Sequence, residues 1–405
     1  VWHHVRSLVA LYKGDFEASF AAARAAADAA AQAGWPQMET LRRLQLAFMH
    51  AEVGNPAAAI AEVQQAEQLI VGTALQFYGC GLLLARAYIA LKQDDSAQCQ
   101  ALLRQALGQA RASSFVFVTR FLPDALPRLF EHALRAGIEV DYTREVIRRL
   151  RILPSPAAGE QWPWPLKLRT LGAFEAWVEN ERIAFLRKAQ RRPLDLLKAL
   201  VALGGQDVEL DRISNALWPD ADGDAARKSL ESALYRVRKL MQQDGLIRLR
   251  EGKLSLDVRR VWVDATQLER ELQGDESPAP LQRVLALYRG HFLDNEREEP
   301  WLLPMRLRLS NLFFVWLRER GAQLERAGDR KTAEGLYRRG LELDPTEEDL
   351  CRRLMRLHCD RGDQAEAMRL YLRCKKALAT QLGASPGAET EALCRTLATM
   401  DARER

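Results

Sequence analysis

The chain has 405 residues, of which 48% are hydrophobic and 28% are charged, and its formal net charge is +5. This length predicts several domains, and this composition excludes a chain that is largely disordered or collagen-like. A membrane-spanning helix is also excluded, because even the alanine-rich run from Ala18 to Ala33 contains Arg24 and Asp28. The mild net charge is compatible with almost any partner, so an argument for nucleic acid has to rest on where the charges lie.

The cysteines are typical of a protein from a reducing compartment. There are six of them and no CxxC pair, so neither a disulfide framework nor a zinc ribbon is expected. Cys351, His358 and Cys359 lie close together in a helical pattern, but no second ligand pair follows at zinc spacing. The sequence therefore predicts no metal site, no cofactor and no membrane partner, in a cytoplasmic protein.

Residues 1–153 contain a repeat. Polar turns at Gly14-Asp15, Gly54-Asn55 and Asp94-Asp95 recur every forty residues, and small apolar positions follow each turn at helical spacing. This pattern predicts stacked helical hairpins of the tetratricopeptide-like kind. The chain begins at Val1 without a methionine, and we expect it to be part of something longer.

The composition of the sequence changes after this array. Four prolines within residues 154–165 predict a linker, because neither a helix nor a central strand continues through them. In residues 166–260, apolar alternation from Leu166 to Phe185 predicts a hairpin, and three helices follow, the third from about Ala225 to Gln242. A last hairpin turns at Glu251-Gly252. A small sheet, three helices and a terminal hairpin is the order of a winged helix-turn-helix domain.

Residues 261–405 contain a second repeat. The turns at Gly328-Asp329 and Gly362-Asp363 are thirty-four residues apart, which is the length of a tetratricopeptide unit, and residues 273–280 are predicted to form an exposed loop. The chain is therefore predicted to be mainly α, with an N-terminal helical array, a central winged helix with small β-sheets, and a C-terminal tetratricopeptide-like α domain.

The third helix of the middle domain has two different faces. A projection at helical spacing puts Leu230, Ala233, Leu234, Val237, Leu240 and Met241 on one stripe, which is the predicted core. The opposite face collects polar and basic side chains, with Arg236 flanking it and Arg227 and Arg238 nearer its edges: Lys228, Ser232, Tyr235 and Lys239. Such residues can contact phosphates or base edges, as a helix in the major groove must.

The terminal hairpin adds charge to this face. If Ile247, Leu249, Leu254 and Leu256 point inward, then Arg248, Arg250 and Lys253 project outward, where a hairpin can reach the minor groove or the backbone. Arg191 and Arg192 stand at another helix start. The alternative is that a basic helix face is only solvated, but the combination of these groups in one domain favours DNA.

The middle and last domains resemble a known family of bacterial transcriptional activators. Residues 187–241 look like the OmpR-type winged helix, and the segments ALYRGHFL and LELDP are similar to the bacterial transcriptional activator domain that accompanies it. The resemblance implies that Lys228, Ser232, Tyr235, Arg236 and Lys239 read operator DNA, and that the loop from Pro219 to Asp224 faces RNA polymerase. One departure is Glu209, a poor cap where the family usually has Ser or Thr.

The N-terminal array, whose last segment is residues 132–152, looks like the superhelical sensor region of large MalT-like regulators. Such regulators carry a nucleotide-binding module upstream. The 405 residues contain no GxxxxGK[ST] phosphate loop, so this chain is not expected to bind ATP through one. We therefore expect an ATPase domain in a longer parent protein.

The sequence thus predicts a DNA-binding transcriptional regulator, an activator that takes part in signal transduction. Its expected partners are double-stranded DNA, RNA polymerase, a second copy on DNA, and an unidentified small-molecule or protein effector at the N-terminal repeats. An enzyme is not expected, because the six histidines are scattered and no nucleophile elbow or HExxH motif is present. The alternative is a repeat-protein scaffold without DNA binding.

Overall fold

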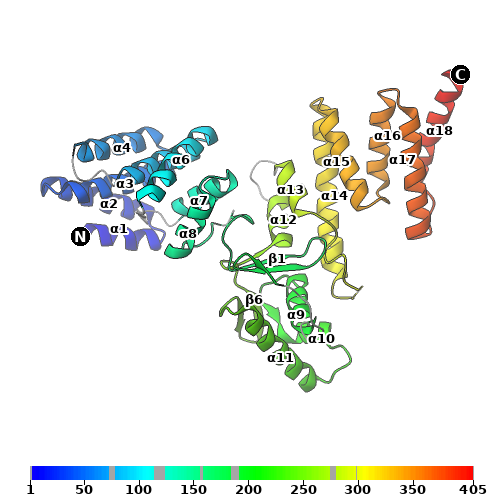
Figure 1. Cartoon of the computed structure of the whole chain (residues 1–405), viewed down its shortest axis with the longest axis horizontal. Coiled ribbons are helices and arrows are strands. Elements are labelled where there is room, and N and C mark those ends of the chain that lie inside the picture. The colour runs from blue at the N-terminus through cyan, green and yellow to red at the C-terminus, as the bar shows by residue number, and fades with distance from the viewer. Residues whose placement is uncertain are drawn as a thin grey trace. The chain divides into compact units, whose positions relative to one another are not determined.

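The structure is a computed structural model that describes residues 2–72, 78–113, 124–155, 158–183, 191–273, 280–297 and 299–404. The chain is mainly α-helical with two small sheets, as the sequence predicted (Figure 1). It divides into two compact units, Val1–Trp164 and Pro165–Arg405. Within the described residues, no helix combines the length and the apolar character that crossing a membrane requires.

The first unit is an array of helical hairpins. Its helices are α1 (Trp2–Tyr12), α2 (Phe16–Gln32), α3 (Pro36–Glu52), α4 (Pro56–Ile70), α5 (Gly79–Lys92), α6 (Ser96–Ser113), α7 (Ala125–Arg135) and α8 (Val140–Leu150). The three predicted turns each begin a helix with a side-chain cap, because Asp15, Asn55 and Asp95 accept the backbone N–H three residues on. Buried alanines such as Ala23 and Ala59 let neighbouring helices pack closely.

The proline-rich segment after α8 is partly folded against the array. The backbone N–H of Gly159 donates to Glu131 Oε1 of α7 over 2.8 Å, and Trp164 Nε1 donates to the Gly159 carbonyl over 2.8 Å. Trp162 and Trp164 are both buried. The segment predicted as a linker therefore carries contacts of its own with the first unit.

The second unit begins with the predicted hairpin and the three predicted helices. The first sheet has strands β1 (Leu166–Arg169), β2 (Glu175–Val178), β3 (Glu181–Arg182) and β7 (Val261–Val263), in the order β3-β2-β1-β7. The helices are α9 (Arg191–Ala202), α10 (Leu210–Leu217) and α11 (Gly223–Met241). The second sheet has β4 (Val208–Glu209), β5 (Ile247–Arg250) and β6 (Lys253–Leu256), in the order β4-β6-β5. Strands β4 and β7 were not predicted, because two or three residues are too few to show an alternating pattern.

The C-terminal helices continue from the first sheet. They are α12 (Asp264–Gln273), α13 (Leu281–Leu287), α14 (Leu303–Arg326), α15 (Arg330–Leu343), α16 (Glu348–Cys359), α17 (Gln364–Ala377), a π-helical turn (Leu378–Leu382) and α18 (Ala388–Glu404). The predicted turns at Gly328-Asp329 and Gly362-Asp363 separate α14 from α15 and α16 from α17. Of the loop predicted over residues 273–280, residues 274–279 lie outside the described part of the chain.

One hydrophobic core runs through the whole second unit, from Leu166 of β1 to Leu378 after α17. In Figure 1, α9, α10 and α11 lie on one side of β1, and α12 lies on the other. Strand β7 pairs with β1 in parallel and leads directly into α12. The winged helix and the helical domain are thus joined by a shared sheet and a shared core.

A buried carboxylate lies at this junction. Asp264, fully buried at the start of α12, accepts the backbone N–H groups of Thr170 and Leu171 at 2.7–2.9 Å and the Thr170 hydroxyl at 2.7 Å. Arg289 Nη2 lies 3.5 Å from the same carboxylate. Burial raises the pKa of the Asp264 carboxyl, while these hydrogen bonds and Arg289 act in the opposite direction. Losing any one of these partners would therefore leave the buried charge incompletely satisfied and would lower the stability of the junction.

We expect Asp264→Asn to destabilise the second unit by about 3 kcal/mol, because an amide nitrogen would face N–H donors and Arg289 would lose its buried counter-charge. The free energy of unfolding from urea denaturation of the full chain measures this loss. Asp220→Asn is the matched control on an exposed loop, and its effect should stay within about 0.5 kcal/mol. Equal effects of the two substitutions would show that the Asp264 network does not stabilise the junction.

Candidate nucleic-acid interface

Local interactions define where helix α11 begins and ends. Asp222 Oδ1 accepts the N–H of Ala225 over 2.7 Å, and Gln242 ends the helix in the left-handed conformation with φ 50°. Glu209 is the N-cap residue of the preceding helix α10, and its side chain makes no capping hydrogen bond in the described structure. The poor cap expected at Glu209 is therefore confirmed. Helices α10 and α11 with the β5–β6 hairpin form a winged helix-turn-helix.

The predicted core stripe of α11 is buried. Leu230, Ala233, Leu234, Val237 and Met241 are each at most 6% exposed. Leu240 is only partly buried at the edge of this stripe. The orientation of the helix follows from this burial, because the residues between these positions must face away from the core.

The predicted outward face is exposed. Tyr235 has 67% of its surface accessible, which is unusual for so large a ring, and the other four residues are exposed as well: Lys228, Ser232, Arg236 and Lys239. In the part of the chain that the structure describes, no hydrogen bond or ion pair holds any of these five side chains. This face therefore carries three cations, a hydroxyl and a phenol that are all available to a partner.

The hairpin differs from its prediction at one residue. Leu249 was expected to point inward, but it is 46% exposed, while its cross-strand partner Leu254 is completely buried. Leu249 lies on the same face as Leu254, but β5 is the edge strand of its sheet and Leu249 is close to the turn, whereas Ile247 at the other end of β5 is buried. The predicted burial of Leu249 was therefore wrong, since alternation does not reveal which part of a hairpin is left uncovered.

Two cations meet at the tip of this hairpin. Arg250 and Lys253 are paired directly across the strands, both are exposed, and the turn between them has positive φ at Glu251 and Gly252. Like charges directly opposite each other destabilise a strand pair. An anion bound at the tip would remove this repulsion.

Two of the predicted contact residues already have partners within the second unit. Arg248 Nη2 donates to the carboxylate of Asp257, which is buried, and Arg227 Nε lies 3.7 Å from Glu231 of its own helix. The Arg227–Glu231 pair is exposed and weak, so Arg227 can still exchange partners. Arg248 is held more firmly, because releasing it would leave a buried carboxylate unpaired.

Arg238 was predicted near the edge of the outward face of α11 but was not among the predicted DNA contacts. Its Nη2 donates to the carbonyl of Ile247 over 3.2 Å, so it connects the end of α11 to the start of the hairpin. Together with Arg248 and Arg250 it lines a hollow of about 420 Å³ between these two elements. Only the tertiary structure shows this cluster, since the three arginines belong to two different elements.

Arg191 and Arg192 begin α9, but their side chains lie outside the described part of the structure. The expected basic contribution at that helix start therefore stays a prediction.

The cysteines and the histidine that had been considered for a metal have ordinary partners in the helical domain. Cys351 Sγ lies 3.8 Å from Met355 Sδ and 3.6 Å from the Leu370 carbonyl. His358 Nε2 lies 3.8 Å from Glu334, and its Nδ1 lies 3.4 Å from Asp363. Among the residues that the structure describes, no group of three or more His, Cys, Asp or Glu side chains is placed to hold a metal ion.

These features define the second unit as a winged helix joined to a tetratricopeptide-like helical domain. Comparison with known families matches residues 256–398 to the bacterial transcriptional activator domain. This part of the chain is therefore similar to the bacterial transcriptional activator domain, as the sequence predicted. The predicted likeness of the N-terminal array to MalT-like sensor regions stays a prediction.

Two curated relatives carry the same name. The chain is 26% identical over 243 residues to the regulatory protein AfsR of Streptomyces griseus, and 27% identical over 251 residues to that of Streptomyces coelicolor. The matches cover 55% and 58% of this chain, but only 24% of each relative. Among solved structures, Mycobacterium tuberculosis EmbR in complex with a low-affinity phosphopeptide aligns with a TM-score of 0.43 and 20% identity, over 58% of this chain and 66% of that one.

Neighbouring residues of α11 provide a test of the outward face. Tyr235→Ala should change the free energy of unfolding by no more than about 0.5 kcal/mol, because the ring is exposed. Leu234→Ala, one residue away, should cost about 3 kcal/mol by opening a cavity in the core. Thermal or urea unfolding measures both. A large loss of stability on replacing Tyr235 would show that the ring has a structural role and would remove it from the proposed interface.

Proposed function

We propose that this chain is a DNA-binding transcriptional regulator that acts as an activator. Helix α11 enters the major groove, and the β5–β6 hairpin contacts the adjacent minor groove or the sugar-phosphate backbone. Lys228, Ser232, Tyr235, Arg236 and Lys239 make the groove contacts. Arg250 and Lys253 contact phosphate from the hairpin tip, and Arg227, Arg191 and Arg192 add basic groups nearby.

The observation that carries this proposal is the set of unpartnered side chains on the outward face of α11. The major groove is about 12 Å wide and admits one helix, and its walls and floor offer phosphate oxygens and base acceptors. The cations of α11 and the paired charges of the hairpin tip lie in one domain and suit that surface. A merely solvated face would not need Tyr235 held 67% exposed in the middle of it.

Arg248 has a supporting role in this proposal. Its ion pair with Asp257 fixes the base of the hairpin, and with Arg238 it makes the hollow between helix and hairpin positive. A phosphate of the backbone that passes from the major to the minor groove would meet this hollow. Arg248 thus contributes to the local field while it stays bonded to Asp257.

The remaining partners follow from the arrangement and from the domain match. The exposed residues from Pro219 to Asp224, which lead into the first turn of α11, are the surface we assign to RNA polymerase. The first unit is the sensor, which takes a small-molecule or protein effector, and two copies bind together on DNA. The chain acts in the cytoplasm, and no catalytic step is part of this proposal.

The test is a triple substitution on the outward face. A duplex is first selected from a random pool by the full chain at two salt concentrations. Lys228→Ala, Tyr235→Ala and Lys239→Ala together should weaken binding about a thousandfold, at roughly a factor of ten for each lost contact. The logarithmic salt slope should become shallower by about 2 if both lysines contact phosphate.

A matched control removes the same residue types elsewhere. Tyr12→Ala, Lys13→Ala and Lys376→Ala change the net charge equally at exposed positions, and this variant should bind like the unchanged chain. Equal binding by the two triple variants would remove α11 as the reading element. Failure of the full chain to retain any duplex would favour the scaffold alternative.

A further inference from the structure

The hollow between the end of α11 and strand β5, which measures about 420 Å³, has a lining that a partner can reach. This volume is in the range of protein pockets that take a small ligand. Its side chains are three cations, one carboxylate and two aliphatic groups: Arg238, Arg248, Arg250, Asp244, Ile247 and Leu249. All of them except Ile247 are exposed. Although Arg248 is paired with Asp257, the lining remains positive, so an anion suits it.

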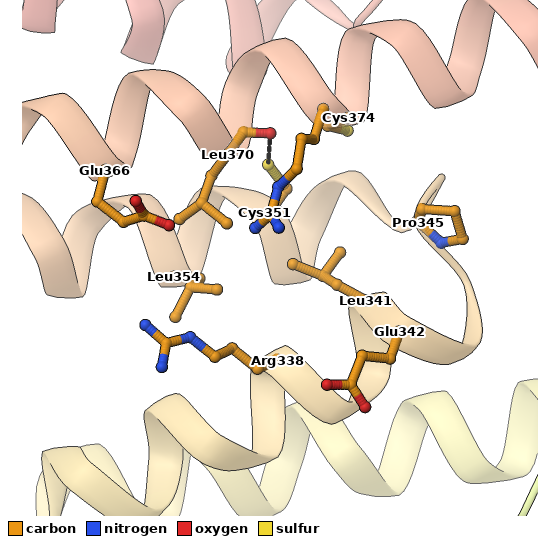
Figure 2. A pocket seen from close by; sticks show the side chains of 10 residues that line it. Arg338, Leu341, Glu342, Pro345, Cys351, Leu354, Glu366, Leu370 and Cys374 are labelled. Atoms are coloured by element: carbon orange, nitrogen blue, oxygen red, sulfur yellow. Dashed lines mark hydrogen bonds between the residues drawn. The ribbon is translucent and has the colours of Figure 1, made fainter.

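The cavity among α15, α16 and α17, of about 350 Å³, differs in this respect (Figure 2). The side chains at its floor are at most 3% exposed: Leu354, Leu370, Cys351 and Cys374. They are closed off from solvent, and the Sγ of Cys351 is occupied by the Leu370 carbonyl at 3.6 Å. Of these two cavities, the hollow beside the hairpin is therefore the one whose lining is open to a partner.

The backbone of Leu249 lies on the free side of the edge strand β5. Arg250 and Lys253 close the two-residue turn of the hairpin, so they form a hydrogen-bonded pair. Hydrogen-bonded and open pairs alternate along an antiparallel ladder, so the next pair, Leu249 and Leu254, exchanges no ladder hydrogen bonds. The N–H and the carbonyl of Leu249 therefore point away from β6, to the side where β5 has no neighbouring strand.

An observed hydrogen bond shows that this free side faces the hollow. Ile247 lies two residues before Leu249, so its carbonyl points to the same side of β5, and it accepts from Arg238 Nη2 over 3.2 Å. Arg238 and Ile247 both line the hollow. The N–H of Leu249 is therefore placed to donate to an anion in the hollow, together with the guanidinium groups of Arg238 and Arg250.

Leu249 also brings an apolar side chain to this anion site. It is 46% exposed, whereas Ile247 in the same strand is 3% exposed. A single exposed leucine is common on protein surfaces, but this one lies beside arginines in a hollow of the DNA-binding domain. The backbone of a nucleic acid alternates an anionic phosphate with a sugar that has apolar carbon atoms. The hollow offers a matching group for each of them.

We propose that the hollow binds one sugar-phosphate unit of the DNA backbone and that Leu249 selects deoxyribose there. Arg238, Arg250 and the N–H of Leu249 bind the phosphate oxygens, and the side chain of Leu249 packs on the 2′-carbon of the sugar. A ribose would press its 2′-hydroxyl against a side chain that cannot form a hydrogen bond with it. This inference rests on the proposed function and adds to it a residue that favours DNA over RNA.

The experiment is a ribonucleotide scan with the full chain and the duplex selected in the test of the proposed function. Each duplex of the set carries one ribonucleotide, at successive positions of both strands, so it differs from the selected DNA by one hydroxyl. We expect one position in the half-site of each copy to weaken binding about tenfold, because the hydroxyl there loses its hydrogen bonds to water. In Leu249→Ala the same position should lose its effect, since the shorter side chain leaves room for a water molecule.

Salt dependence separates the apolar contact from the charged ones. Leu249→Ala should weaken binding to the unmodified duplex about fivefold with an unchanged logarithmic salt slope, because no charge is lost. Arg250→Ala should make that slope shallower by about 1. Leu249→Met keeps an apolar contact and should behave like the unchanged chain in affinity and in the scan. Leu372→Ala, at a leucine that is 55% exposed on α17, is the matched control and should alter neither.

The outcomes distinguish this inference from the proposed function. A full chain that retains the duplex but shows no sensitive position would overturn the role of Leu249 and leave the proposed function in place. A sensitive position that stays equally sensitive in Leu249→Ala would do the same. If the full chain retains no duplex at all, the proposed function fails and this inference fails with it.

Discussion

The Asp264 carboxylate is the constraint on which the second unit depends. It accepts the backbone N–H groups of Thr170 and Leu171, which directly follow β1 in the winged helix, and it belongs to the first residue of α12, in the helical domain. A buried carboxylate costs free energy unless hydrogen bonds satisfy its oxygen atoms. Separating the segment after β1 from the start of α12 would therefore destabilise the second unit. Arg289, which reaches both Asp264 and Glu175, brings in a third segment.

Further contacts strengthen this junction. Leu293 N donates to the Thr170 carbonyl over 2.7 Å, and Gly172 N donates to the His291 carbonyl over 2.9 Å. Lys198 of α9, almost completely buried, pairs with Glu296 over 2.6 Å. The winged helix is therefore held at defined points on the helical domain, so that α11 and the hairpin present their charges on a rigid support, as accurate recognition requires.

The sequence was sufficient for features that depend on local patterns. Helical periodicity gave the core stripe of α11 and hence its outward face, because burial and exposure follow from one projection. The polar turns at Asp15, Asn55 and Asp95 gave the helical hairpins, because a cap is a local hydrogen bond. For the same reason the absence of Ser or Thr at Glu209 correctly predicted an uncapped helix start.

Features that depend on distant segments could not be predicted in this way. Leu249 is exposed because β6, and not β5, meets β4, and a two-residue strand has no recognisable pattern. The pairing of Arg248 with Asp257 and the place of Arg238 beside the hairpin need the tertiary fold. Nothing in the local sequence around Asp264 shows that Thr170 and Leu171, more than ninety residues earlier, donate to its carboxylate.

The most direct measurement is photo-crosslinking from the face of α11 to DNA. A photoreactive phenylalanine analogue at Tyr235 lies in the centre of the proposed interface, and the same analogue at Leu372, 55% exposed on α17, lies on the helical domain. We expect irradiation to join the chain to a selected duplex from position 235 and not from position 372. Crosslinks from position 372 alone, or none from position 235 while the chain retains the duplex, would contradict it.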